Sequence, residues 1–282
     1  MDFIKLRNIW FAVAGVFIAA SLAVLIFNFV SGRGILNFGI DFTGGTSWIV
    51  RFDQPVALAD LRAALSGEKV SITTIDADFS IKTTEFSDAQ KQNFTDILQS
   101  FGEYQILDFE NIGPSAGRDL SRQAALLTVL VLTGMLMYIT FRFEFWTGLA
   151  AVLCLLHDVI ITLGFVSALR LNFDISMIAA ILTIVGYSIN ATIIIFDRIR
   201  ENLNSGKNAD IAAVANISLR SVLGRCIMTS VTTILAVLAV YLFGGASIKP
   251  FALTMFIGFV FGAYSSTFLA APLLVVFRKL TD

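Results

Sequence analysis

Six apolar segments, each about as long as a membrane is thick, dominate this chain of 282 residues. A hydrocarbon core of about 30 Å requires ~20 apolar residues in helical conformation, because each backbone amide and carbonyl must be satisfied within the helix. The predicted spans are Ile9–Val30, Ala124–Phe141, Trp146–Leu169, Ile175–Phe196, Val222–Phe243 and Phe251–Phe277. This pattern predicts a polytopic α-helical membrane protein with six transmembrane helices.

The composition agrees with this class and excludes others. Hydrophobic residues make up 56% of the chain and charged residues 15%, whereas soluble domains average about 45–50% and about 25%. A formal net charge of −1 leaves no basic surplus to neutralise phosphates, so nucleic acid is not expected as a partner. Cys154 and Cys226 lack the spacing of a metal site and are expected to pack as small apolar side chains. No metal or cofactor is expected.

The first apolar segment could be mistaken for a secretory signal peptide. Its apolar run exceeds the roughly 7–15 residues of the apolar region of a signal peptide, and no small-residue cleavage site precedes the polar stretch that follows. We therefore expect a membrane anchor that is retained.

Lys and Arg residues near the span ends predict the orientation. With a cytoplasmic N-terminus, the cytoplasmic flanks carry ten basic residues, and the two short exterior loops carry only Arg170 and Lys249. The ten are Lys5, Arg7, Arg142, Arg198, Arg200, Lys207, Arg220, Arg225, Arg278 and Lys279. Because cytoplasmic loops retain Lys and Arg, both termini are expected on the cytoplasmic side.

Residues 31–122 form a sizeable polar region that this orientation places on the exterior face. Its periodicities predict the order β-α-β-β-α-β, which is typical of a ferredoxin-like split unit. The predicted elements are Thr46–Phe52, Leu58–Leu65, Val70–Ile75, Phe79–Thr84, Asp88–Phe101 and Tyr104–Phe109. The predicted organisation is a cytoplasmic N-terminus and first transmembrane helix (1–30), one small exterior α+β domain (31–122) and a five-helix bundle (123–282).

Polar residues inside the spans mark candidate functional positions, and Asp158 in the third span is the deepest acid. It lies about twelve residues from the inner end, or ~18 Å deep at 1.5 Å per residue. Ionising a carboxyl group there is costly, so two roles stay open: ion coupling, or a neutral hydrogen bond between helices. The neighbouring His157, the one histidine of the chain, is expected to be structural rather than a metal ligand.

The fourth and fifth spans carry further polar residues. Residues 185–202 read VGYSINATIIIFDRIREN, in which Ser188, Asn190 and Thr192 form a polar cluster expected to face a bundle interior or a hydrated path. Asp197 and Arg198 begin the charged run at the cytoplasmic end of this helix.

Arg225, Thr229 and Thr232 of the fifth span are spaced i, i+4 and i+7, which places them on one helical stripe. Arg225 alone could extend to the cytoplasmic edge of the membrane. The threonines favour an inward-facing polar surface.

A glycine-rich segment, GIDFTGGT, follows the first span at residues 39–46. Gly44 and Gly45 permit tight backbone geometry, and the Asp41 carboxylate can accept hydrogen bonds from nearby amides. The segment lacks the Lys-Ser/Thr pair of a phosphate-binding loop, so a structural turn is expected.

Taken in order, these motifs resemble a known family. GIDFTGGT, then ENIGPSAGRDL before the second span, LLHD in the third, GYSIN followed by FDRIREN in the fourth, and NISL, GR and TSVTT leading into the fifth are all similar to SecF. The SecF family comprises bacterial protein-export membrane proteins of the RND transporter superfamily. The similarity extends over essentially the whole chain and also matches the predicted topology.

The resemblance implies partners and a function. SecD would form a pseudo-symmetric pair with a protein of this family, and the pair would associate with the SecYEG channel in the bacterial plasma (inner) membrane. Surrounded by membrane lipid, the pair would promote late translocation of an unfolded exported polypeptide by using the ion gradient. By motif match, Asp158 and Arg225 are carried over as coupling candidates.

One position departs from the family pattern. Family members commonly carry an Asp after the Asn of the fourth-span motif, and the resemblance links that Asp to proton conduction. Here the position is Ala191, which cannot carry a proton. Three explanations stay open: an acid supplied by SecD, a different coupling ion (proton or sodium), or weak coupling.

Two other function classes fit less well. An RND-type exporter of small molecules would need about twice as many spans and two large exterior domains in one chain. An intramembrane protease would need paired acids or a Ser/His pair in characteristic motifs, whereas Asp158 and Asp197 lie at different depths and outside such motifs. The exterior region has no His or Cys, so a protein-contact module is expected there. We therefore expect a transport subunit rather than an enzyme.

Overall fold

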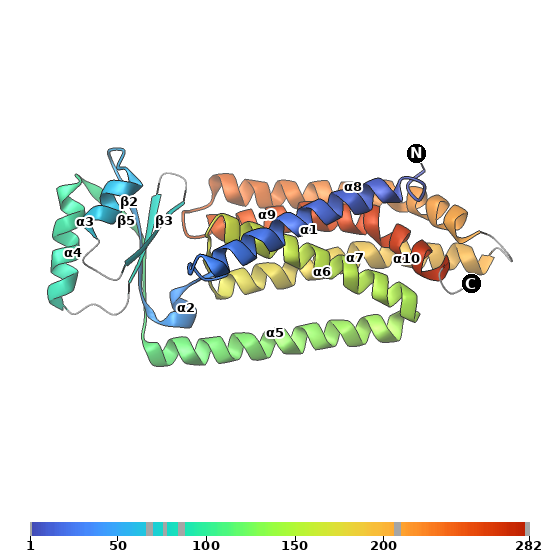
Figure 1. Cartoon of the computed structure of the whole chain (residues 1–282), viewed down its shortest axis with the longest axis horizontal. Coiled ribbons are helices and arrows are strands. Elements are labelled where there is room, and N and C mark those ends of the chain that lie inside the picture. The colour runs from blue at the N-terminus through green and yellow to red at the C-terminus, as the bar shows by residue number, and fades with distance from the viewer. Residues whose placement is uncertain (1, 66–69, 76–77, 84–87, 206–209, 280–282) are drawn as a thin grey trace.

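The computed structural model describes residues 2–65, 70–75, 78–83, 88–205 and 210–279. Within these ranges six helices are long and apolar enough to cross a membrane, which confirms the predicted polytopic helical fold. They are α1 (Arg7–Val30), α5 (Pro114–Arg142), α6 (Phe145–Ala168), α7 (Ile175–Ser205), α8 (Ile211–Phe243) and a last span built from α9 (Lys249–Tyr264), the π-helix η1 (Ser265–Leu269) and α10 (Ala270–Lys279). Figure 1 shows these helices along the long axis of the molecule, with a small sheet domain at one end.

Several helices extend beyond the predicted apolar spans. α5 begins at Pro114, because a proline in the first turn lacks only an amide that would have no partner within the helix. α7 continues beyond Phe196 to Ser205, and its charged end is supported by an ion pair between Arg198 and Glu201. Hydropathy detects only the apolar part of a helix and therefore underestimates its length.

The region that we call the exterior domain, after its predicted side of the membrane, contains β2 (Gly45–Phe52), α3 (Leu58–Ala64), β3 (Val70–Ile75), β4 (Asp78–Thr83), α4 (Asp88–Ser100) and β5 (Tyr104–Ile112). The span ends next to it are called the outer ends. Its strand order is β3-β4-β2-β5, with all neighbours antiparallel. Each β-α-β unit is thus split by a strand of the other, which is the arrangement expected for this element order. The ferredoxin-like label itself stays a prediction.

Thr84 of the predicted third strand and Lys207 of the basic flanks lie outside the described residues.

The sheet of this domain packs against α3 and α4 on the side away from the membrane helices (Figure 1). Val50 and Ile81 of the central strands are fully buried, as are Leu61 of α3 and Leu98 of α4. The opposite face of the sheet is turned toward the outer ends of the spans, where the Asn172 amide donates to the Ser80 hydroxyl at 3.0 Å. The sheet therefore lies between its own helices and the bundle.

Two short strands join the exterior domain to the bundle. β1 (Asn37–Phe38) and β6 (Asn172–Phe173) pair in parallel although they follow different spans, and the sequence Leu-Asn-Phe occurs at both. The Lys82 ammonium of β4 donates to Oδ1 of Asn37 at 3.0 Å and to the carbonyl of Phe38 at 2.9 Å. Desolvation by burial lowers the pKa of Lys82 to about 8. β4 is thereby tied to the outer ends of α1 and α6.

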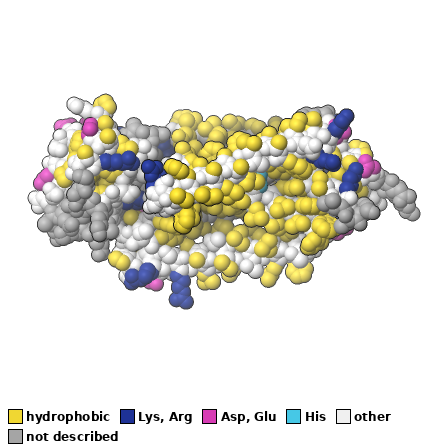
Figure 2. Space-filling view, in the orientation of Figure 1, with side chains coloured by type: hydrophobic (Ala, Val, Ile, Leu, Met, Phe, Trp, Pro, Cys, Tyr) yellow, Lys and Arg dark blue, Asp and Glu magenta, His cyan; other side chains and the backbone are white. Residues whose placement is uncertain are grey.

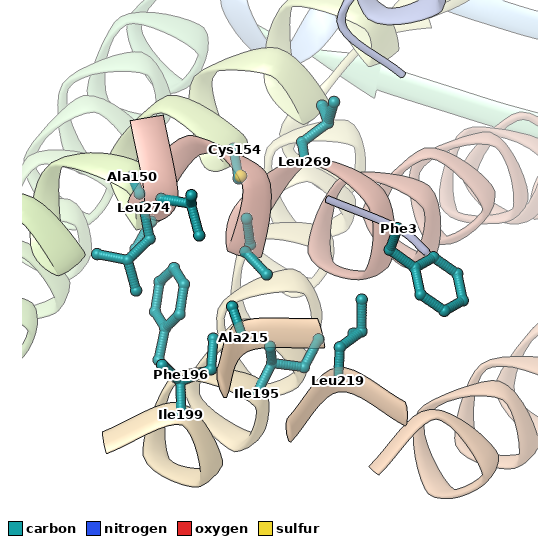
Figure 3. Packing of buried hydrophobic residues seen from close by; sticks show 14 of the residues in the cluster. Phe3, Ala150, Cys154, Ile195, Phe196, Ile199, Ala215, Leu219, Leu269 and Leu274 are labelled. Carbon is teal, nitrogen blue, oxygen red and sulfur yellow. The ribbon is translucent and has the colours of Figure 1, made fainter. Parts of the chain in front are cut away.

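The main apolar core of the bundle lies away from the exterior domain. Phe196 of α7 points toward Leu274 of α10 (Figure 3), and Ile199 of α7 and Leu219 of α8 belong to the same cluster. Cys154 of α6 lies in the same core as a free, fully buried cysteine. Figure 2 shows hydrophobic side chains over the helical bundle and Lys and Arg side chains near its two ends.

Candidate functional site

Asp158 of α6 lies at the centre of a buried polar cluster formed by three parts of the bundle. Its side chain has no exposed surface. The hydroxyls of Ser188 from α7 and Ser265 from η1 donate to Oδ2 at 2.5 and 2.8 Å, and Nδ1 of His157 lies 2.8 Å from Oδ1. Both carboxyl oxygens are thus satisfied, as a buried polar group requires. We call these four residues the Asp158 cluster.

Ser265 lies where α9 passes into the π-helix, and its amide still donates to the carbonyls of Gly262 and Phe261, so it reaches the acid in the helical phase of α9. A single π-turn inserts an extra residue into a helix, and such turns are frequent at functional sites. Gly262, one turn earlier, leaves room: a Cβ atom there would lie 3.3 Å from Cβ of Ser188 and 3.7 Å from Oδ2 of Asp158. Sequence reasoning missed Ser265. The available signal was the run Ser265-Ser266-Thr267 inside an otherwise apolar span.

His157 has one ring nitrogen without a partner. Nε2 is buried and has no hydrogen bond in the described part of the chain, while Nδ1 contacts Asp158. The ring centroid lies 6.0 Å from that of Tyr264 and 6.5 Å from that of Phe261, both on α9. His157 therefore belongs to the Asp158 cluster, and its ring lies beside two aromatic rings of α9. Among the residues searched, no group of three or more potential metal ligands occurs.

The structure divides the predicted polar cluster of α7 between two faces of the helix. Ser188 and Thr192 are 0% and 1% exposed, one helical turn apart, on the face that packs inside the bundle. Asn190 lies between them in sequence but is exposed on another face. One face of the fourth-span motif thus contacts the buried Asp158, and another face is exposed on the surface of the bundle.

The polar stripe of α8 also lies on an uncovered surface. Arg225, Thr229 and Thr232 are exposed, so the prediction of an inward-facing stripe is wrong for the chain's own bundle. The buried position is Ser230, whose hydroxyl accepts a hydrogen bond of 2.7 Å from Tyr187 of α7. Polar residues occur on both sides of this helix, so periodicity alone could not choose the buried side. We call the exposed set Asn190, Arg225, Thr229 and Thr232 the open polar face.

The glycine-rich segment packs closely against the starts of α5 and α7, at the outer end of the bundle. Oδ2 of Asp41 accepts a hydrogen bond of 2.8 Å from the amide of Ile175, at the start of α7. Gly44 and Gly45 have φ values of 69° and 120°, which other residues rarely adopt. A Cβ atom on Gly44 would lie 3.0 Å from Cα of Pro114. The segment therefore fixes the start of α5 and α7 relative to the exterior domain.

The charged residues at the C-terminal end of α7 form ion pairs. Asp197 pairs with Arg142 of α5 at 2.6 Å and with Arg200 at 3.5 Å. Arg198 pairs with Glu201 at 2.7 Å, and its Nε donates to the Ser221 hydroxyl of α8. This end of α7 therefore links three helices, and Asp197 and Arg198 act there through ion pairs and hydrogen bonds.

An acidic cavity of about 220 Å³ lies between the sheet and the outer ends of the spans. Its acidic lining residues are Asp41, Asp108, Glu110 and Asp174. Desolvation by burial and then the neighbouring carboxylates raise the pKa of Glu110. The Ser247 hydroxyl, in the turn between α8 and α9, donates to Asp108 at 2.6 Å and connects this side of the sheet to the bundle.

Two family models match the chain. The C-terminal model of the SecD/SecF protein-export membrane proteins matches residues 93–280, and the SecD/SecF GG motif matches residues 36–56, which include Gly44 and Gly45. The chain belongs to the SecD/SecF family. The family resemblance predicted from the motifs is thereby confirmed.

Individual relatives agree with the family models. The protein translocase subunit SecF of Rickettsia prowazekii is 39% identical, over 86% of this chain and 82% of the relative. The protein of the same name from Acidaminococcus fermentans is 40% identical, over 94% and 96%. The crystal structure of SecDF, a translocon-associated membrane protein from Thermus thermophilus, matches 99% of this chain with a TM-score of 0.88 and 34% identity. This chain spans 39% of that SecDF chain.

These matches place the chain among SecF-type protein translocase subunits, and the predicted role in protein transport is confirmed. The relatives are named as components of a transport machinery, which agrees with the expectation of a transport subunit.

Proposed function

We propose that the chain is the SecF half of a SecD–SecF complex that assists Sec-dependent protein translocation across the bacterial plasma membrane, driven by a transmembrane ion gradient. The observation that carries the proposal is the open polar face of α7 and α8. A lone subunit would leave this face against lipid.

The physical argument is the cost of exposing polar groups to hydrocarbon. An ionised arginine and an amide in a membrane segment require partners, and such residues almost always face another helix or a hydrated cavity. Arg225 and Asn190 are exposed, so this chain's own bundle does not bury them. The family models cover SecD as well as SecF, and the solved relative is a SecDF protein, which supports SecD as the partner at this face.

The surfaces of α1, α5 and the exterior domain suit other partners. Exposed apolar side chains on α1 and α5, such as Phe29 and Leu126, suit contact with membrane lipid or with the SecYEG channel. The exterior domain then lies on the side where an unfolded exported polypeptide leaves the channel. It carries uncovered apolar side chains on β5, among them Ile106 and Phe109.

For coupling to an ion gradient, this chain departs from the family pattern in the fourth span. Ala191 occupies the position at which the family commonly has its acid, and it is 9% exposed. Asp158 is then the acid of this chain that lies deepest in a span, and Arg225 is the charged group of the open polar face. Either a proton or a sodium ion fits this description.

Affinity purification from native membranes tests the proposal. The tagged chain should be recovered with SecD and, under mild solubilisation, with SecYEG subunits. Recovery of the chain by itself, under conditions in which a tagged SecYEG subunit retains its known partners, would refute the assignment.

Replacing Asn190 by leucine should weaken export while leaving membrane insertion intact. The change removes a hydrogen-bonding amide from the open polar face, and we expect a loss of ~0.6–2 kcal/mol in assembly, since interhelical hydrogen bonds in membranes are worth about that. The measurements are recovery of SecD with the variant and the rate of export of a secreted reporter. Leu126→Ala on α5 is the matched control. Normal export and SecD recovery in Asn190→Leu would contradict the proposed interface.

The proposed orientation has both termini in the cytoplasm and the sheet domain outside. A cysteine introduced at Gln92, which is exposed on α4, should react with a membrane-impermeant thiol reagent. The reagent is added to cells whose outer envelope has been permeabilised while the plasma membrane stays intact. Tags fused at the two termini should stay protected until the plasma membrane is permeabilised. Labelling of position 92 only after that step would reverse the orientation.

A further inference from the structure

The Asp158 cluster contains two titratable groups that are adjacent in sequence and in contact. Asp158 is completely buried and His157 is 4% exposed, with Nδ1 and Oδ1 at 2.8 Å. The other titratable groups nearby are the Cys154 thiol, one turn away on α6, and the Tyr264 phenol of α9, which donates to the carbonyl of Trp10. Among the residues that the structure describes, α7 and η1 present only the Ser188 and Ser265 hydroxyls to the carboxyl group.

We propose that His157 and Asp158 together form the proton-carrying site of this chain, with Nε2 of His157 as the entry atom. The inference rests on the proposed function, because it names the ion and the site through which the gradient acts. Three observations carry it: the buried carboxyl group, the direct His–Asp contact, and a buried imidazole nitrogen that has no partner within the described residues.

The proton transfer can be followed atom by atom. In the resting arrangement Nδ1–H of His157 donates to Oδ1, while the two serine hydroxyls donate to Oδ2. A proton from the gradient binds the lone pair of Nε2 and forms an imidazolium. The Nδ1–H bond then breaks as an O–H bond forms on Oδ1. One proton is taken up, and the products are a neutral imidazole protonated on Nε2 and a neutral carboxylic acid.

This step changes what holds the helices together. A carboxylate is a much stronger acceptor than a neutral carboxylic acid, so the hydrogen bonds from Ser188 and Ser265 weaken when Asp158 is protonated. Ser188 is on α7, and Asn190 of the open polar face follows two residues later. Ser265 is in the π-helix, where the last span is irregular. Proton uptake is thereby transmitted to the surface that faces the proposed partner.

The position of the site also fits the peculiarity of this sequence. Ala191 lies on α7, the same helix as Ser188, and is buried at 9% exposure. The acid that the family commonly has at that position is absent here, whereas α6 supplies an acid that contacts α7 directly. The proton site therefore lies on the neighbouring helix, from which it still acts on α7.

The test uses the full-length complex with SecD, reconstituted into vesicles together with SecYEG and its ATPase. Asp158→Asn keeps the shape of the side chain and one acceptor oxygen but removes titration. His157→Asn keeps an N–H donor near the position of Nδ1 and removes the relay. Thr162→Val is the matched control, because this buried hydroxyl donates to the backbone carbonyl of Asp158 at 2.7 Å without contacting the carboxyl group.

Two readouts are measured for each variant: the carbonyl stretch of a protonated carboxylic acid in pH-difference infrared spectra, and translocation with and without an imposed pH gradient. Wild type and Thr162→Val should show the band and a gradient-stimulated rate. Asp158→Asn should lose both, and His157→Asn should lose the stimulation. All complexes should retain SecD.

The outcomes separate this inference from the proposed function. A wild-type complex that is stimulated by the gradient, together with an Asp158→Asn complex that is stimulated equally, overturns the proton site and leaves the export role intact. Absence of a titrating band that depends on Asp158 has the same consequence. Failure of the wild-type chain to retain SecD overturns the proposed function itself.

Discussion

Replacing Asp158 by leucine is expected to prevent stable assembly of the bundle. The leucine cannot accept hydrogen bonds, so the imidazole of His157 and the hydroxyl of Ser188 would be left buried without their acceptor, while Ser265 would keep only its contact with the carbonyl of Gly262 at 3.2 Å. Each unsatisfied group costs about 1–3 kcal/mol, and two together are a large fraction of the stability of a typical domain. This is the largest effect that we expect from a single substitution in the chain.

Thermal inactivation of the purified, detergent-solubilised protein measures this effect. After heating, Asp158→Leu should cease to elute as a single peak in size-exclusion chromatography at a much lower temperature than wild type. Asp158→Asn should stay close to wild type because it keeps an acceptor oxygen. Equal thermal stability of Asp158→Leu and wild type would show that the cluster does not hold α6, α7 and the last span together.

Replacing Gly164 by leucine is expected to separate α1 from α6. A Cβ atom at position 164 would lie 2.3 Å from Cβ and 2.7 Å from Cα of Ser21, so a larger side chain must push the backbone of α1 away. The same seam contains Asn28, whose amide donates to the carbonyl and the hydroxyl of Ser167. Overpacking typically costs about 1–3 kcal/mol, and a clash with backbone leaves little room for relaxation.

Disulfide trapping across the seam reports this separation. A cysteine pair at positions 28 and 167 should form a disulfide readily in an otherwise wild-type background, and Gly164→Leu should strongly reduce its yield. Gly134→Leu on α5 is the matched control, since a Cβ atom at position 134 meets nothing within 4 Å. An unchanged yield in Gly164→Leu would mean that α1 is not held in this position.

The arrangement of spans was predictable because hydrocarbon imposes a length and a polarity on every crossing helix. The strand and helix order of the exterior domain was also predictable, since alternating and helical periodicities are distinct. The parallel pairing of Asn37–Phe38 with Asn172–Phe173 was not, because two-residue strands carry no periodicity and their partners are far apart in sequence. Lys82 was missed for another reason, because the sequence does not distinguish a buried lysine in a strand from a lysine on the surface.

The candidate site was only partly predictable. Asp158 and Ser188 could be identified because polar residues within apolar spans are conspicuous. The side on which each one lies depends on helix rotation, so Arg225 and Thr229 were expected inward and are exposed. Ser265 was missed because a lone hydroxyl in a span carries no charge and belongs to no motif, although the run Ser265-Ser266-Thr267 marked the place.

Photo-crosslinking from Thr229 in native membranes tests the central claim most directly. A photoreactive amino acid at this exposed position of the open polar face should form a covalent product with SecD, while the same probe at Leu130, an exposed apolar position on α5, should not. The account predicts a SecD adduct at 229. Crosslinks at 229 to lipid alone, in cells that export normally, would contradict it.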